Sequence, residues 1–222
     1  MESALQPRPN AIFRDPFSGF SHLVAAIASV AGLVLLIFQA LDFGDTQDLV
    51  GFIIFGSGMI MMFLASAIYH LYNGKSEVIV HLKRLDHIAI FIMIAGGYTP
   101  LCLSPLRDDY GYALLSSVWG VAIVGILLKV FWLHAPRILS TGIYLFLGWA
   151  CVFAVYPMLN NMTSTALWWM LAGGLSYSFG AIVYGTKKPD PWPGIFGFHE
   201  IWHLFVIGGA FCHFWAIAFH II

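Results

Sequence analysis

The chain has 222 residues, of which 60% are hydrophobic and only 9% are charged, and its formal net charge is −1 at pH 7. So few charged groups cannot cover the surface of a water-soluble protein, which excludes a soluble globular domain. A net charge near zero also argues against a nucleic-acid partner. We therefore expect a polytopic membrane protein whose partners include membrane lipids.

Seven apolar runs follow one another along the chain, each close to the roughly 20 residues that a helix needs to cross the hydrocarbon core. The polar breaks between them are too short to hold a separate soluble domain, so residues 1–222 are expected to form one all-α, seven-transmembrane helix bundle. The predicted spans are Phe20–Leu41, Leu49–Tyr72, Leu85–Leu103, Tyr112–Leu133, Ile138–Tyr156, Thr165–Tyr184 and Phe198–Ile221.

Residues 1–19 contain no apolar stretch of the kind that a cleaved signal peptide needs, so they are expected to be a short cytoplasmic segment before a retained first helix. Among the Lys and Arg residues, only Arg107 falls on the far side of the predicted membrane. The positive-inside rule then places the N-terminus in the cytoplasm and the C-terminus outside. The residues predicted on or near the cytoplasmic side are Arg8, Arg14, Lys75, Lys83, Arg84, Lys129, Arg137, Lys187 and Lys188.

Polar residues from three distant parts of the chain fall at one predicted depth, near the cytoplasmic face. Ser66 and His70 lie in the last two turns of the second span. Asp86 lies in the first turn of the third span, and His199 and His203 lie in the first two turns of the seventh. Because residues four apart share a helical face, each of these two pairs can point inward. The sequence therefore predicts a polar site inside the bundle.

Three neutral imidazoles that leave a fourth tetrahedral position open are the ligands of a catalytic zinc rather than a structural one. We expect His70, His199 and His203 to hold Zn²⁺, which supplies hydroxide at neutral pH and polarises a carbonyl. Asp86 is expected to accept a proton or to orient water or a ligand histidine, and Ser66 to steady the water or a developing oxyanion. Taken singly, each residue also fits a structural role, as a helix contact or a helix-start ion pair.

The other histidines are expected to lie outside the metal site. His22 is at the right depth for a supporting group or a spare ligand. His213 comes ten residues after His203, too far along the helix axis to share a metal, and should line the bundle interior nearer the outer leaflet. The remaining histidines are expected to be solvated, namely His81, His87, His134 and His220.

Two other function classes fit the same residues. The segment His199-Glu200-x-x-His203 matches the zincin motif, which predicts an intramembrane metalloprotease with Glu200 as essential base, Asp86 as a ligand and His70 dispensable. The shared depth of Ser66 and His70 has no explanation in that case, which favours the three-histidine site. A non-enzymatic receptor or sensor with a structural zinc is the second alternative.

The chain resembles the hemolysin III branch of the progestin and adipoQ receptor family from about Phe17 to His220. The resemblance rests on Ser66–His70, on Leu85-Asp86, on Ala95-Gly96-Gly97-Tyr98-Thr99-Pro100, and on Gly197–His203 with His213 downstream. The combination is specific, because Ser-x3-His, an Asp at the head of the third span and His-x3-His recur in order and at similar separations.

The resemblance implies zinc on His70, His199 and His203, with Ser66 and Asp86 beside it. It also implies a bacterial plasma membrane protein, similar in architecture to membrane ceramidases, that hydrolyses an amide or ester bond in a lipid-like substrate. The branch takes its name from a cytolytic activity, which an integral helical protein without a cleavable signal suits poorly. This chain departs from the family at the head of the first span, where Asp15, Ser18 and His22 stand for an acidic residue, an asparagine and a histidine. That departure leaves the role of His22 open.

Overall fold

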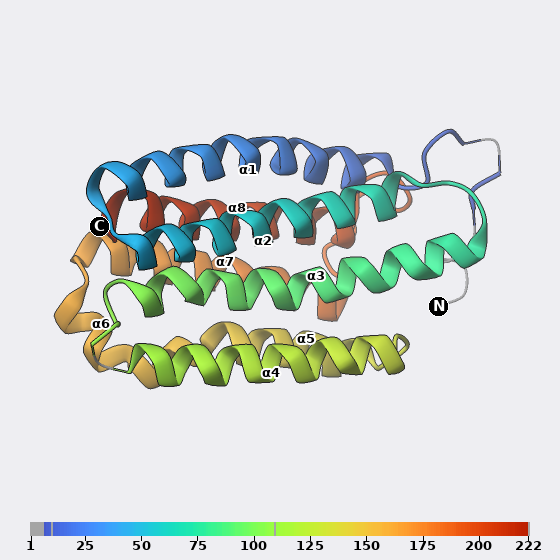
Figure 1. Ribbon diagram of the computed structural model, residues 1–222. Coiled ribbons are helices and arrows are strands. Elements are labelled where there is room, and N and C mark those ends of the chain that lie inside the picture. The colour runs from blue at the N-terminus through green and yellow to red at the C-terminus, as the bar shows by residue number, and fades with distance from the viewer. Residues whose placement is uncertain (1–6, 10, 109, 222) are drawn as a thin grey trace.

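A computed structural model describes residues 7–9, 11–108 and 110–221 and arranges them as long helices that run side by side (Figure 1). No β-strand occurs within these residues, so the all-α prediction is confirmed. The helices are α1 (Pro16–Phe43), α2 (Thr46–Leu71), α3 (Ser76–Leu103), α4 (Gly111–Phe131), α5 (Arg137–Gly148), the 3₁₀ segment η2 (Trp149–Ala154), α6 (Val155–Asn161), α7 (Ser164–Thr186) and α8 (Phe198–His220).

Six helical segments are long and apolar enough to cross a membrane, with α5, η2 and α6 counted together as Arg137–Asn161. The third helix, α3, is not among them. Its first three turns carry charged residues, including Glu77, Lys83 and Arg84. It nevertheless packs lengthwise between α2 and α4. Length and composition therefore establish six candidate spans.

The helix α3 begins at Ser76, well before the predicted start at Leu85. Asp86 consequently lies in the third turn of α3, and the prediction that it lies in the first turn is wrong. The reason is that hydropathy marks where apolar residues begin, whereas a helix can extend into polar surroundings. The residues before Leu85 include glutamate, lysine and arginine, which are good helix formers.

The predicted fifth span, Ile138–Tyr156, is not one continuous α-helix. It is interrupted by η2 at Trp149–Ala154. A polar side chain of α3 satisfies the interrupted backbone, because the Tyr98 hydroxyl donates a hydrogen bond to the Gly148 carbonyl at 2.6 Å and accepts one from the Cys151 amide at 2.9 Å. Irregular backbone is tolerated at membrane depth when protein groups replace the missing hydrogen bonds.

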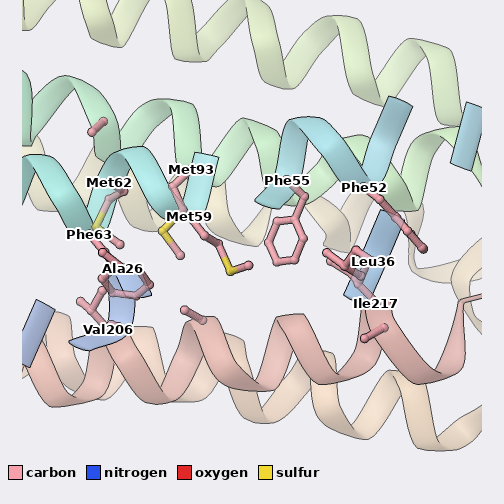
Figure 2. Packing of buried hydrophobic residues seen from close by; sticks show 14 of the residues in the cluster. Ala26, Leu36, Phe52, Phe55, Met59, Met62, Phe63, Met93, Val206 and Ile217 are labelled. Atoms are coloured by element: carbon pink, nitrogen blue, oxygen red, sulfur yellow. The ribbon is translucent and has the colours of Figure 1, made fainter. Parts of the chain in front are cut away.

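Two clusters of buried apolar side chains hold the helices together. The first lies among α1, α2, α3 and α8 and includes Phe52, Phe55, Met59 and Ile217 (Figure 2). The second lies among α3, α4, the α5–η2–α6 segment and α7. The end of α2 and the beginnings of α1, α3 and α8 meet at one end of the bundle, which we call the histidine end (Figure 1).

Candidate metal centre

The structure brings together the three histidines that were predicted to bind a metal. His70 lies in the last turn of α2, and His199 and His203 lie in the first two turns of α8. One ring nitrogen of each lies within 4.8 Å of those of the other two. His70 Nε2 and His199 Nε2 are 3.4 Å apart. His70 and His203 are buried, and His199 is half-buried. Because α2 and α8 run antiparallel, the end of α2 lies beside the start of α8, and histidines that are far apart in the sequence meet.

The contact between His70 and Asp15 suits a metal ion in this cluster. The Nδ1 of His70 lies 3.3 Å from Asp15 Oδ2. An ionised carboxylate only accepts hydrogen bonds, so in a neutral His70 ring the proton on Nδ1 leaves the Nε2 lone pair directed toward His199. The buried Nδ1 of His203 has no hydrogen-bond partner. Converging imidazole lone pairs, with the far nitrogen of one ring bound to a carboxylate, are the arrangement that metal sites use.

Asp15 was not predicted as a site residue, and the backbone explains its position. Its amide donates to the His70 carbonyl at 2.9 Å, which fastens the chain before α1 to the end of α2. Arg14 reinforces this contact by donating to the Tyr69 carbonyl at 2.6 Å. Burial raises the pKa of Asp15, but His70 and Arg14 outweigh that effect, so the pKa lies below its usual value and the carboxylate stays ionised. The acidic residue that the family carries at the head of the first span was the available signal.

His22 lies directly beside the cluster. Its ring stacks on that of His203, with 3.9 Å between centroids and 23° between planes. His22 is 3% exposed, and neither of its ring nitrogens has a hydrogen-bond partner. It therefore belongs to the wall of the site, although it is outside the group of three whose nitrogens converge.

Ser66 and Asp86 lie at the same end of the bundle, buried next to the histidines. The Asp86 carboxylate interacts with the Ser66 hydroxyl and with the charges of His70 and Lys83. The hydrogen bond that orients a ligand histidine comes from Asp15. This arrangement leaves Asp86 free for a different task inside the site.

Glu200 has a structural role in this fold, because both of its carboxylate oxygens accept hydrogen bonds. Its Oε2 accepts the Gly197 amide at 2.8 Å, which caps the first turn of α8, and its Oε1 accepts the Ser18 hydroxyl at 3.1 Å. Capping satisfies an amide that the helix itself cannot pair. The carboxylate that the zincin motif requires as a base is thus bound to the backbone and to α1.

The other histidines divide between the interior and the surface. His81 and His134 are exposed, as predicted. The prediction that His87 is solvated is wrong, because its Nδ1 is buried, has no hydrogen-bond partner and belongs to a residue that lines the central cavity. His213 lines the same cavity and stacks on Tyr177, with 5.6 Å between ring centroids.

A cavity of about 1100 Å³ leads from the histidine cluster into the bundle. Its polar end is lined by His22, Ser66, His70, Asp86, His199 and His203. Further in, its lining is mainly apolar and includes Ile90, Met93, Leu145, Val155, Met158 and Met170. A large apolar pocket with a few converging polar groups is typical of a small-molecule site.

These features define the class of protein, a helical membrane protein with a buried histidine cluster above an apolar cavity. The model of the haemolysin-III related family matches residues 10–214, and the chain belongs to this family. The resemblance to the hemolysin III branch of the progestin and adipoQ receptor family is thereby confirmed.

Bacterial and animal relatives agree with this assignment. The chain is 36% identical to a hemolysin-3 homolog of Bacillus subtilis (strain 168), over 91% of this chain and 92% of that protein. It is 35% identical to hemolysin-3 of Bacillus cereus, over 92% of this chain and 90% of that protein. Identity to the adiponectin receptor protein of Drosophila melanogaster is 27%, over 90% of this chain and 49% of that protein. The chain is a multi-pass integral membrane protein of the bacterial plasma membrane.

Proposed function

We propose that the protein is a zinc-dependent hydrolase of an amide or ester bond in a lipid-like substrate. The observation that carries the proposal is the convergence of His70, His199 and His203, with ring nitrogens within 4.8 Å, at the polar end of a cavity of about 1100 Å³. Three histidines leave a coordination position for a reactant, which a structural zinc site does not. The apolar cavity offers the acyl part of the substrate a place beside the reacting group.

We also propose that α3 is a seventh span and that the histidine end faces the cytoplasm. Helix α3 packs along α2 and α4, and both of these neighbours are candidate membrane spans. This packing supports the proposal that α3 also crosses the membrane. The Lys and Arg residues support this orientation, because all of them except Arg107 belong to segments at or near the histidine end. On this topology residues 1–222 form a single membrane domain, with the N-terminus inside and the C-terminus outside.

The chain's own residues supply binding, orientation and proton transfer. His70, His199 and His203 would hold the zinc ion, which when bound would supply an activated water and a polarised carbonyl oxygen. Asp15 holds His70 in the tautomer that presents Nε2 to the site. Asp86 accepts the proton released when the carbonyl is attacked, and the Ser66 hydroxyl donates to the developing oxyanion or to the attacking oxygen. The buried setting strengthens each of these interactions.

Metal analysis of purified variants tests the site. We expect near-stoichiometric zinc in detergent-purified wild type by elemental mass spectrometry, and its loss in His70→Ala and His203→Ala. Glu200→Gln should keep the metal, because Glu200 caps α8. Zinc that survives His70→Ala but disappears in Asp86→Asn would contradict the three-histidine site and support the metalloprotease alternative, in which Asp86 is a ligand and Glu200 is the base.

Hydrolysis assays then separate an enzyme from a receptor. Wild type should release fatty acid from N-acyl or O-acyl lipids in detergent micelles, and Asp86→Asn should reduce the rate by about a hundredfold or more while retaining zinc. Zinc-loaded protein that binds such lipids without turnover, and in which Asp86→Asn changes nothing, would instead support a receptor or sensor.

A further inference from the structure

The basic residues of the described chain fall into two groups that differ in their partners. Arg8, Arg14 and Arg107 each form an ion pair with an aspartate. In the residues that the structure describes, no ion pair is formed by Lys83, Lys129 or Arg137. All three of these lie toward the histidine end, on α3, α4 and α5.

Lys129 is the most unusual member of the second group, because it is only 1% exposed. Its ammonium donates a hydrogen bond to the Ser140 hydroxyl on α5. The charged group that acts on it is another cation, Lys83. A lysine at a membrane surface usually extends its ammonium to water, which a fully buried side chain cannot do. A buried ammonium without an anionic partner is costly, so its position favours a bound anion.

Lys129 does not itself line the cavity that holds the histidine cluster, but its hydrogen-bond partner Ser140 does. Lys83, His87, Arg137 and Ser140 all line this cavity. Lys83 and Lys129 both act electrostatically on His87, whose buried Nδ1 has no hydrogen-bond partner. We call Lys83, His87, Lys129, Arg137 and Ser140 the cationic pocket. Its members come from three helices, so it is formed only in the folded protein.

Arg137 is held in place without being neutralised. Its guanidinium donates to the Tyr184 carbonyl at 3.2 Å and stacks over the Tyr184 ring at 4.4 Å. These contacts fix its direction and leave its charge uncompensated. The nearby carboxylate, Asp86, interacts with Lys83 and with Ser66 and His70 at the metal site. One shared carboxylate does not balance Lys83, Lys129 and Arg137.

We propose that the cationic pocket binds the anionic headgroup of a lipid, a phosphate or a carboxylate, while the acyl chain lies in the apolar part of the same cavity. This inference rests on the proposed function, which assigns a lipid-like substrate. It adds that the headgroup of this lipid is negatively charged. Arginine, lysine and a hydroxyl supply several donors for phosphate or carboxylate oxygens. The headgroup site and the histidine cluster share one cavity, so a bound lipid would be held beside the reacting groups.

Native mass spectrometry of the full-length protein in detergent tests this proposal without requiring turnover. Oleoyl lysophosphatidic acid serves as the anionic probe and monooleoylglycerol as a neutral probe with the same acyl chain. We expect wild type to prefer the anionic lipid, and Lys129→Met to weaken its binding by about tenfold while leaving the neutral lipid unaffected. Lys75→Met is the matched control, because Lys75 is an exposed lysine near the same end whose hydrogen-bond partner Tyr72 does not line the cavity, whereas Lys129 contacts the cavity-lining Ser140.

A second variant protects the test against misfolding of Lys129→Met. Ser140→Ala removes the hydroxyl that Lys129 contacts, and it should weaken anionic lipid binding by about threefold with an unchanged thermal unfolding curve. Equal binding of the two lipids to wild type, or equal weakening by Lys75→Met and Lys129→Met, would overturn the proposal. Inorganic phosphate that binds as tightly as the lipid, with the same sensitivity to Lys129→Met, would overturn the lipid assignment in favour of a free-anion site.

The zinc content of each sample separates this proposal from the hydrolase proposal. Lipid binding that depends on Lys129 in a protein without zinc would contradict the hydrolase alone. Zinc-loaded protein that hydrolyses neutral and anionic lipids equally, with no effect of Lys129→Met, would contradict the cationic pocket alone.

Discussion

The two ends of the bundle handle their charged groups in different ways. Away from the histidine cluster, Asp45, Asp48 and Arg107 form a closed network that ties the start of α2 to the turn after α3. Arg107 Nη1 lies 2.6 Å from Asp45 Oδ2, and Arg107 Nη2 lies 3.5 Å from Asp48 Oδ1. The side chain of each aspartate also accepts a hydrogen bond from the backbone amide of the other, and these two bonds cap the start of α2. Each charge in this carboxylate network has a partner within the chain.

The histidine end leaves several polar atoms without a partner in the protein. Both ring nitrogens of His22 and the Nδ1 atoms of His87 and His203 are buried without hydrogen bonds. Buried polar groups in folded proteins are nearly always paired, so each exception needs an explanation. The carboxylate network pairs its charges within the chain, whereas the histidine end keeps buried ring nitrogens that a bound ion or molecule would satisfy. The following experiments test that difference.

Metal removal should have the largest effect. A metal at about a thousand times its Kd stabilises the folded state by about 4 kcal/mol. We expect EDTA to lower the thermal unfolding temperature of wild type by several degrees, as measured by tryptophan fluorescence, and added zinc to restore it. His203→Ala should start from the lower temperature and respond to neither treatment. An equal EDTA response in His203→Ala would place the metal elsewhere.

Removing the charge of Asp15 should weaken the metal site without destroying it. Asp15→Asn keeps the side-chain shape but loses the carboxylate that orients His70. Loss of such an outer partner typically lowers metal affinity by about 10- to 100-fold. Competition with a zinc indicator measures this change, and Asp42→Asn, at an exposed aspartate, is the control. Equal affinities in the two variants would show that the Asp15–His70 contact has no role in metal binding.

Glu200→Ala tests whether one polar group at the histidine end is structural. It removes the cap of α8 and should lower stability by about 1 kcal/mol. The zinc content should stay at the wild-type level. Chemical denaturation in mixed micelles gives the stability change, and elemental mass spectrometry gives the metal. A stable protein that has lost its zinc would identify Glu200 as a ligand instead.

The carboxylate network should show the smallest effect, and acid should abolish it. The hydrogen bond from Arg107 lowers the pKa of Asp45 to about 2, below the value near 4 of an unfolded chain. Because the folded-state pKa is depressed, the associated stability is present above pH 4 and is lost as the pH falls toward 2. The unfolding free energies of wild type and Asp45→Asn should therefore become equal as the pH falls through this range. A gap that persists at pH 2 would mean that the pair acts through something other than charge.

Sequence reasoning found the three converging histidines because their signal is local and periodic. His199 and His203 are four apart on one helix, and charge bias placed His70 at the same depth. Asp15 and His87 were missed for the opposite reason. Asp15 precedes the first apolar run and reaches His70 through contacts between residues 55 positions apart. His87 was missed because hydropathy marks a span but does not specify which side of α3 faces the cavity.

The sequence by itself determined the all-α class, six of the spans and the depth shared by the polar residues, because hydropathy and the 3.6-residue period are properties of neighbouring residues. Only the tertiary structure decided that Asp15 orients His70, that Glu200 caps α8, and that Tyr98 satisfies the break at Gly148. It also decided that Lys129 is buried next to Lys83. These are pairings between different helices, and they depend on how each helix is rotated and where it begins, which no local pattern specifies.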